Sequence, residues 1–90
     1  MTTGFDQSTG PAGFASLTPR ERAVLSGLVS GLRPADIARR DFVSVVTVRN
    51  QVQSILIKLN VHSQLEAVAA ARWSGWADPA VEGAPAAAAI

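Results

Sequence analysis

Apolar residues recur at helical spacing through the middle of the chain, and this period constrains the fold more than any other feature. Residues 24–32 and 48–59 each carry apolar side chains three or four positions apart, which places them on one face of an α-helix. No segment alternates apolar and polar residues between turn signals, as a strand with one buried face would. The sequence therefore predicts an all-α fold, and its 90 residues suit one domain.

Helix-capping residues mark the start and the end of the first predicted helix. It begins at Thr18-Pro19-Arg20-Glu21, where the Thr18 hydroxyl and the Glu21 carboxylate can form a capping box. Proline fits the first helical position because its missing N–H would have no partner there. Gly31 can adopt the left-handed conformation that commonly ends a helix.

Three more helices follow from the same kinds of signal. The second begins near Pro34 and is expected to turn its apolar residues inward, with Phe42 as a further candidate for the core. Ser44 is expected to cap the third, which runs to about residue 59. Ser63, with a glutamate three residues later, predicts a second capping box, and the fourth helix runs from there to Gly75.

Both ends of the chain differ in composition from the middle. Residues 1–16 are rich in Gly, Ser and Thr and predict a flexible N-terminal arm, and residues 77–90 form an Ala/Pro tail predicted to be disordered. The predicted domain at residues 17–76 holds all eight Lys and Arg residues and four acidic ones, so it carries +4 while the flanks carry −3. A basic domain between acidic ends favours an anionic partner such as nucleic acid.

Several classes of function are excluded by residues that the sequence lacks. The absence of cysteine excludes disulfide scaffolds and thiolate metal sites, and no apolar run is long enough to cross a membrane. The single histidine, His62, has no second metal ligand at a suitable spacing, and the serines have no histidine–carboxylate pair. We therefore expect a soluble intracellular protein that is not an enzyme, with no catalytic, cofactor-binding or metal-binding residues.

The helix, short turn and helix at residues 34–59 carry the predicted binding face. On the third helix, the side opposite the apolar stripe shows residue types that suit the edges of bases: Val46, Arg49, Asn50 and Gln53. Arginine forms paired hydrogen bonds with guanine, and Asn and Gln do so with adenine, while Val46 or Ile57 can touch a thymine methyl group. Residues suited to phosphates are Ser44, Thr47, Lys58, Arg39 and Arg40. Such a polar helix face is also commonly just solvated surface, so this pattern alone leaves both interpretations open.

The residues of this unit and of its flanks resemble a known family. The segment LTPRERAVLSGLVSG…PADIARRDFVSVVTVRNQVQSILIKLNVHSQLEAVAAARWSGW is similar to the LuxR-type, or GerE-type, helix-turn-helix domain over residues 17–76. The resemblance implies a small four-helix bundle that binds double-stranded DNA and regulates transcription in the bacterial cytoplasm, associated with the nucleoid when bound. It implies a recognition helix at residues 45–59 in the major groove, with Arg49, Asn50 and Gln53 against the bases.

The resemblance also implies a homodimer, at least on DNA, that forms mainly through the last helix. In that helix the sequence offers three small residues for the dimer surface: Ala67, Ala70 and Ala71. Alanine is also common helix filler, which is the simpler interpretation of these positions. Two aromatic residues near the end of the helix, Trp73 and Trp76, are expected to cover the open edge of the bundle, with a role as partner anchors as the alternative.

Some features depart from the family pattern and keep a second function open. Asp41 replaces a large apolar residue, so its carboxylate either caps the turn or re-aims the end of the second helix. The binding face has fewer cations than usual. No sensing domain fits before Leu17, so the chain is expected to be a standalone regulator or a domain cut from a longer protein. The alternative function is a protein-interaction module that docks on RNA polymerase or on a related regulator.

Overall fold

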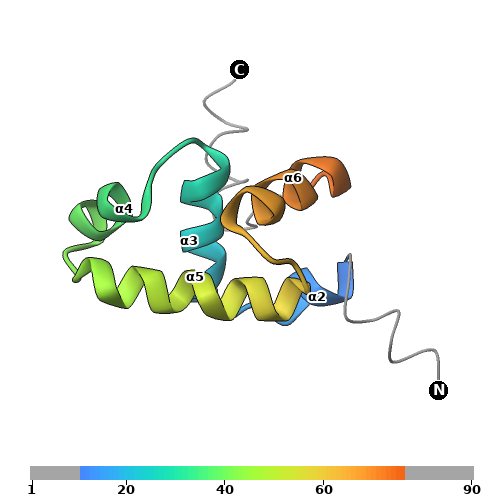
Figure 1. The fold of residues 1–90 in the computed structure, drawn as a ribbon, viewed down its shortest axis with the longest axis horizontal. Coiled ribbons are helices and arrows are strands. Elements are labelled where there is room, and N and C mark those ends of the chain that lie inside the picture. The colour runs from blue at the N-terminus through green and yellow to red at the C-terminus, as the bar shows by residue number, and fades with distance from the viewer. Residues whose placement is uncertain (1–10, 77–90) are drawn as a thin grey trace.

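The computed structural model describes residues 11–76, which form five helices and contain no strand. The helices are α2 (Pro11–Ala15), α3 (Pro19–Val29), α4 (Pro34–Asp41), α5 (Val45–Leu59) and α6 (Gln64–Ser74). Helix α5 is the longest and contacts every other helix of residues 11–76. In Figure 1 it crosses the molecule beneath α3, with α4 above one end and α6 above the other. The predicted all-α fold is confirmed, and its four helices correspond to α3 to α6.

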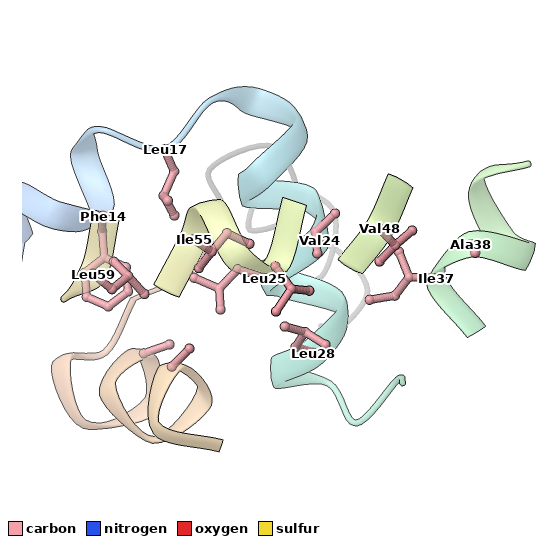
Figure 2. Close-up of a cluster of buried hydrophobic side chains, with 13 residues drawn as sticks. Phe14, Leu17, Val24, Leu25, Leu28, Ile37, Ala38, Val48, Ile55 and Leu59 are labelled. Atoms are coloured by element: carbon pink, nitrogen blue, oxygen red, sulfur yellow. The ribbon is translucent and has the colours of Figure 1, made fainter. Parts of the chain in front are cut away.

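The core lies where α3, α4 and α5 meet. Its largest fully buried side chains come from all three helices: Val24, Leu25, Ile37, Val48 and Ile55 (Figure 2). These residues belong to the apolar stripes whose spacing predicts the helices. Burying such a side chain stabilises the fold by roughly 1.5–3 kcal/mol, and this packing holds α5 although β-branched residues lower its intrinsic helix propensity.

Side-chain caps fix where the helices begin. The Glu21 N–H donates to Thr18 Oγ1 at 3.1 Å and the Thr18 N–H donates to Glu21 Oε1 at 2.9 Å, so the predicted capping box is present. At the start of α5 the Thr47 N–H donates to Ser44 Oγ at 3.1 Å. Gly31 has a φ of 101°, the left-handed conformation predicted for the end of α3.

The second capping box, at the start of α6, differs from the prediction. The Glu66 N–H donates to Ser63 Oγ at 3.1 Å, as expected. The Glu66 carboxylate, however, accepts from the N–H of His62 at 2.7 Å instead of from the N–H of Ser63. Ser63 is therefore an N-cap as predicted, and the carboxylate satisfies the donor one residue earlier.

The predicted arm at residues 1–16 differs from the structure at its C-terminal end. Pro11–Ala15 form α2, and Phe14 is only 5% exposed. Its ring stacks on that of Trp76, with 5.7 Å between the ring centroids, and it lies beside Leu59 in Figure 2. This helix forms because the apolar Phe14 side chain can be buried against residues near the other end of the domain. Residues 1–10 and the predicted tail at residues 77–90 lie outside the described part of the chain.

Two aromatic side chains predicted to be buried are instead exposed. Phe42 is 93% exposed because α4 ends at Asp41 and Phe42 turns into the left-handed conformation, with a φ of 58°, away from the core. Trp73 is 94% exposed on α6, so the expectation that it covers the bundle is wrong. Trp76 does pack against the core, through Phe14.

Candidate nucleic-acid interface

The exposed face of α5 brings the predicted base-reading residues together. Val48, Val52, Ile55 and Leu59 face the core, and with 3.6 residues per turn the opposite side of the helix must face solvent. That side carries a set of exposed residues that we call the α5 ridge: Val46, Arg49, Asn50, Gln53 and Ile57. The ridge therefore presents the predicted base-reading residues on one continuous surface.

Arg49 is the cation of this ridge. Its side chain is exposed, and it forms no ion pair or hydrogen bond with any residue between 11 and 76. An arginine without an internal partner keeps all its N–H donors for a ligand. Asn50 and Gln53, one and four residues after it, are likewise exposed.

The start of α5 presents two hydroxyl groups. Ser44 Oγ lies 3.0 Å from Thr47 Oγ1, and both residues are exposed. The N-terminal end of a helix carries a partial positive charge from its aligned peptide dipoles. Together, the dipole and the hydroxyl groups can bind an anionic oxygen such as that of a phosphate.

The two arginines at the end of α4 are exposed but not free of partners. Arg39 Nη2 lies 2.9 Å from Asp36 Oδ1. Arg40 donates from Nε and Nη2 to the two oxygens of Asp41, at 2.9 and 3.1 Å. The paired hydrogen bonds from Arg40 hold the pKa of the Asp41 carboxyl below its usual value. The carboxylates of Asp36 and Asp41 therefore offset part of the positive charge that the sequence places at this edge.

Asp41 also connects α4 to α3. Its Oδ2 lies 3.2 Å from Arg20 Nη1, while Arg40 binds the same carboxylate from its own helix. The carboxylate therefore binds two guanidinium groups and does not cap the turn, which was one of the two expectations for this departure. It forms an ion-pair cluster with Arg20 and Arg40 at the surface, where an apolar residue would instead have packed.

Lys58 does not join the ridge, and its predicted phosphate contact stays a prediction. Its Nζ lies 2.8 Å from Glu21 Oε1 and donates to the Ser16 carbonyl oxygen at 3.2 Å. The Lys58 side chain is 31% exposed and that of Glu21 is 9% exposed. Lys58 therefore connects the end of α5 to the start of α3 and to the segment after α2.

The Glu21 carboxylate is the centre of this cluster. Burial raises the pKa of Glu21, but hydrogen bonds from Lys58, Ser54 and the Thr18 backbone outweigh it and lower the pKa from 4.5 to about 2. The Ser54 hydroxyl donates to Glu21 Oε2 at 2.6 Å. The sequence predicts Glu21 only as a helix cap and gives no role to Ser54. The one signal in the sequence is that Ser54 and Lys58 lie four residues apart and so share one side of α5.

The structure buries two of the three predicted dimer residues on α6. Ala67 and Ala71 are both 0% exposed and pack in the core of their own chain, and Ala70 is half-buried against it. The small side chains of Ala67 and Ala71 allow α6 to lie close to α3 and α5, so these two residues are not available to a second molecule, whereas Ala70 keeps part of its surface exposed. The exposed apolar residues of α6 are Leu65, Ala69 and Trp73.

No metal-binding group of three or more His, Asp or Glu side chains occurs within residues 11–76. His62 is exposed, with its Nδ1 3.8 Å from Glu66 Oε1. The helices in the described part of the chain are also too short or too polar to span a bilayer.

Comparison with known proteins identifies the fold. The family of bacterial regulatory proteins called the luxR family, or GerE, matches residues 15–71. A nitrate/nitrite response regulator protein homolog of Haemophilus influenzae is 44% identical over 52 residues, which cover 58% of this chain and 25% of that protein. The transcriptional regulatory protein DesR of Bacillus subtilis is 37% identical over 60 residues, which cover 67% of this chain and 30% of that protein.

The chain thus spans less than a third of the length of these two relatives, and no solved structure gives a significant match. The family match covers α3, α4 and α5 in full, including the helix-turn-helix unit that carries the ridge. This chain belongs to the LuxR family of helix-turn-helix proteins, which are DNA-binding regulators of transcription and not a class of enzymes.

Proposed function

We propose that α5 is the recognition helix and enters the major groove of duplex DNA with its ridge against the bases. The observation that carries this proposal is the exposed Arg49, which has no internal partner among residues 11–76 and lies beside Asn50 and Gln53. Arginine binds guanine through two hydrogen bonds, and Asn and Gln bind adenine in the same way. One cation and two amides on one helix face therefore favour a sequence-specific contact over a purely electrostatic one.

The residues around the turn suit the DNA backbone on either side of the groove. Ser44 and Thr47 lie at the N-terminus of α5, whose dipole favours a phosphate. Arg39 and Arg40 lie at the end of α4, and both are exposed on the surface next to that turn. A phosphate competes with Asp36 and Asp41 for these arginines, so we expect their contribution to affinity to be smaller than that of free arginines.

This proposal is tested by selecting bound fragments from random DNA and then measuring the affinity of the protein for the selected duplex. Arg49→Ala is expected to weaken specific binding by about 1–3 kcal/mol and to relax the preference at one base pair, without changing the fold. Arg72→Ala is the matched control, because it removes the same charge from α6, where Arg72 donates to the Val29 carbonyl oxygen. Equal affinity of the Arg49 variant and the native protein for the selected duplex would contradict the proposal.

We also propose that two copies bind adjacent half-sites through the exposed side of α6. Leu65 and Trp73 are 78% and 94% exposed, and with Ala69 they follow each other at intervals of four residues, which forms one apolar stripe. An exposed tryptophan such as Trp73 commonly supplies much of the binding energy at the centre of a protein interface. This stripe replaces the buried alanines as the candidate dimer surface.

A duplex with two half-sites about 10 base pairs apart tests this stripe by sedimentation or native mass spectrometry. The Trp73→Ala variant is expected to lose cooperative binding of the second copy. Its affinity for a duplex with a single half-site is expected to stay unchanged, and this measurement is the internal control. Unchanged cooperativity would show that the stripe is not the dimer surface.

The alternative function, docking on RNA polymerase or on a related regulator, has the same exposed stripe in its favour. The dependence of binding on salt separates the two functions. For DNA binding, the logarithm of the association constant falls linearly with the logarithm of the salt concentration, with a slope of about −0.9 for each phosphate contact. Docking through Leu65 and Trp73 is expected to show little slope.

A further inference from the structure

One carboxylate on α4 is shared by two arginines that lie on different helices. Arg40, its neighbour in the chain, donates to Asp41 from Nε and Nη2 at 2.9 and 3.1 Å. Arg20, on α3, lies with its Nη1 3.2 Å from Oδ2 of the same carboxylate. The Asp41 side chain is 16% exposed, whereas those of Arg40 and Arg20 are 43% and 38% exposed. The carboxylate is therefore largely enclosed, and the guanidinium groups that bind it still reach solvent.

A glycine inside α3 leaves the space in which the Arg40 guanidinium group lies. A Cβ atom at Gly27 would be 3.3 Å from Arg40 Nη1 and 3.0 Å from Ile37 Cδ1. Glycine in the interior of a helix lowers its stability relative to alanine, and here the missing side chain admits both α4 and the end of the Arg40 side chain. The position in which Arg40 binds Asp41 is therefore provided by the packing of α3 against α4.

Arg20 has a donor that the described part of the chain does not use. Its Nη2 group is buried and has no hydrogen-bond partner among residues 11–76. A guanidinium group binds a carboxylate best through two parallel N–H donors, and this Nη2 group is a second donor beside the Nη1 group that faces Asp41. If Arg40 turned away, Arg20 would still neutralise the Asp41 charge. The carboxylate would then keep a partner, and an unpaired charge is what makes breaking an enclosed ion pair costly.

The place of Arg40 in the fold indicates what competes with Asp41 for it. Arg40 is the last residue but one of α4, and residues 42–44 lead directly from that helix to the first turn of α5 (Figure 1). We propose that Asp41 is an internal competitor for a DNA phosphate: it binds Arg40 in the free protein, releases it to the DNA backbone on binding, and stays paired with Arg20. This inference rests on the proposed function and adds how the affinity for the DNA backbone is set.

A double-mutant cycle in the full chain tests the competition. Affinity is measured for a duplex of arbitrary sequence, because a phosphate contact does not depend on the bases. Asp41→Asn is expected to raise this affinity about two- to fivefold, since DNA no longer has to break an exposed ion pair. In a protein that already carries Arg40→Ala, most of this gain is expected to disappear.

Asp36→Asn is the matched control for the gain in net charge. It removes the same charge from the same helix, but Asp36 binds Arg39, with 2.9 Å between Oδ1 and Nη2. Its effect on affinity is therefore expected to be the same with and without Arg40→Ala. A gain from Asp41→Asn that is equally independent of Arg40 would be a general charge effect and would overturn this inference, as would no gain.

Circular dichroism verifies that each variant is folded. If Asp41→Asn does not fold, NMR of the native protein answers the same question, because the Nε–H resonance of Arg40 is expected to shift when the duplex is added. An unshifted resonance overturns the inference.

The outcomes separate this inference from the proposed function. If Arg49→Ala relaxes the base preference but the cycle shows no coupling, the recognition role of α5 stands and the competition by Asp41 falls. If the cycle shows coupling but Arg49→Ala changes nothing, Asp41 competes with the DNA backbone and the recognition role falls. A native protein that binds no duplex overturns both.

Discussion

The two ends of α5 use their charged and polar side chains in opposite ways. Near its C-terminus, Lys58 and Ser54 bind the buried Glu21 carboxylate, at 2.8 and 2.6 Å. Nearer its N-terminus, Arg49 is exposed and has no partner among residues 11–76. A cation with a buried internal partner supports the fold, and a cation without one is available to a ligand. This comparison assigns Lys58 and Arg49 different roles although both are basic residues of one helix.

Among substitutions in the cluster at the C-terminal end of α5, removal of the Glu21 carboxylate is expected to lower the stability of the fold most. Glu21→Ala leaves Lys58 and Ser54 without their partner and is expected to lower the free energy of unfolding by about 2–4 kcal/mol. Chemical denaturation measures this loss. Glu66→Ala is the matched control, since Glu66 is the corresponding helix-capping residue of α6 but is exposed, and it is expected to cost only about 0.5–1 kcal/mol. Equal losses in the two variants would mean that the cluster adds nothing beyond capping.

Acid is expected to lower the stability of the fold through the same cluster at the C-terminal end of α5. The pKa of Glu21 is about 2 in the folded protein against an ordinary value of 4.5, so its contribution is complete above pH 4.5 and is lost as the pH falls toward 2. The loss should reach about 3 kcal/mol, since each unit of pKa corresponds to about 1.4 kcal/mol. Unfolding curves between pH 5 and pH 2 measure it, with Glu21→Gln as the reference for the other carboxyl groups. If the native protein and the Glu21→Gln variant lose stability equally as the pH falls, Glu21 is not the cause.

Substitution of the two cations tests the comparison itself. Lys58→Met is expected to lower stability by about 1–3 kcal/mol, because it leaves the Glu21 carboxylate unpaired in a largely buried place. It should leave the salt dependence of DNA binding unchanged. Arg49→Met is expected to do the reverse, with stability unchanged and specific affinity reduced. A smaller salt slope for Lys58→Met, by about one phosphate contact, would restore the phosphate role predicted from the sequence.

The Ser54 hydroxyl should have the smallest effect. Ser54→Ala removes one hydrogen bond to Glu21 and adds a residue with better helix propensity, so we expect a net loss of about 1 kcal/mol. Thermal unfolding is sufficient to detect it, with Ser74→Ala as a control for a serine that donates only to a backbone carbonyl oxygen. No loss of stability would show that the Ser54 hydrogen bond adds little beside the Lys58 ion pair and the Thr18 backbone hydrogen bond.

The sequence predicts the helices well because their signals are local. Thr18 with Glu21, Gly31 and Ser44 each act within a few residues, and the apolar stripe of α5 defines its exposed ridge by geometry alone. The same reasoning predicts the cap at Glu21 but not its second role, since Lys58 is distant in the sequence.

The errors concern residues whose environment depends on distant packing. Alanine suits both a close interface and the core, and only the approach of α6 to its neighbours shows that Ala67 and Ala71 are buried. Phe14 reads as part of a flexible segment because its partner, Trp76, is at the other end of the domain. Trp73 and Trp76 lie three residues apart, yet one is exposed and the other packs on the core, a difference that composition cannot give.

The stacking of Phe14 on Trp76 has a topological consequence. It brings the first and last described parts of the chain to one place, beside the C-terminal end of α5 and far from the α4–α5 turn (Figure 1). The ring contact therefore holds the two ends of the described segment, near Phe14 and Trp76, close together in space. A circularly permuted gene that joins these two points and opens the chain at the surface loop around Gly31 should therefore still encode a folded protein.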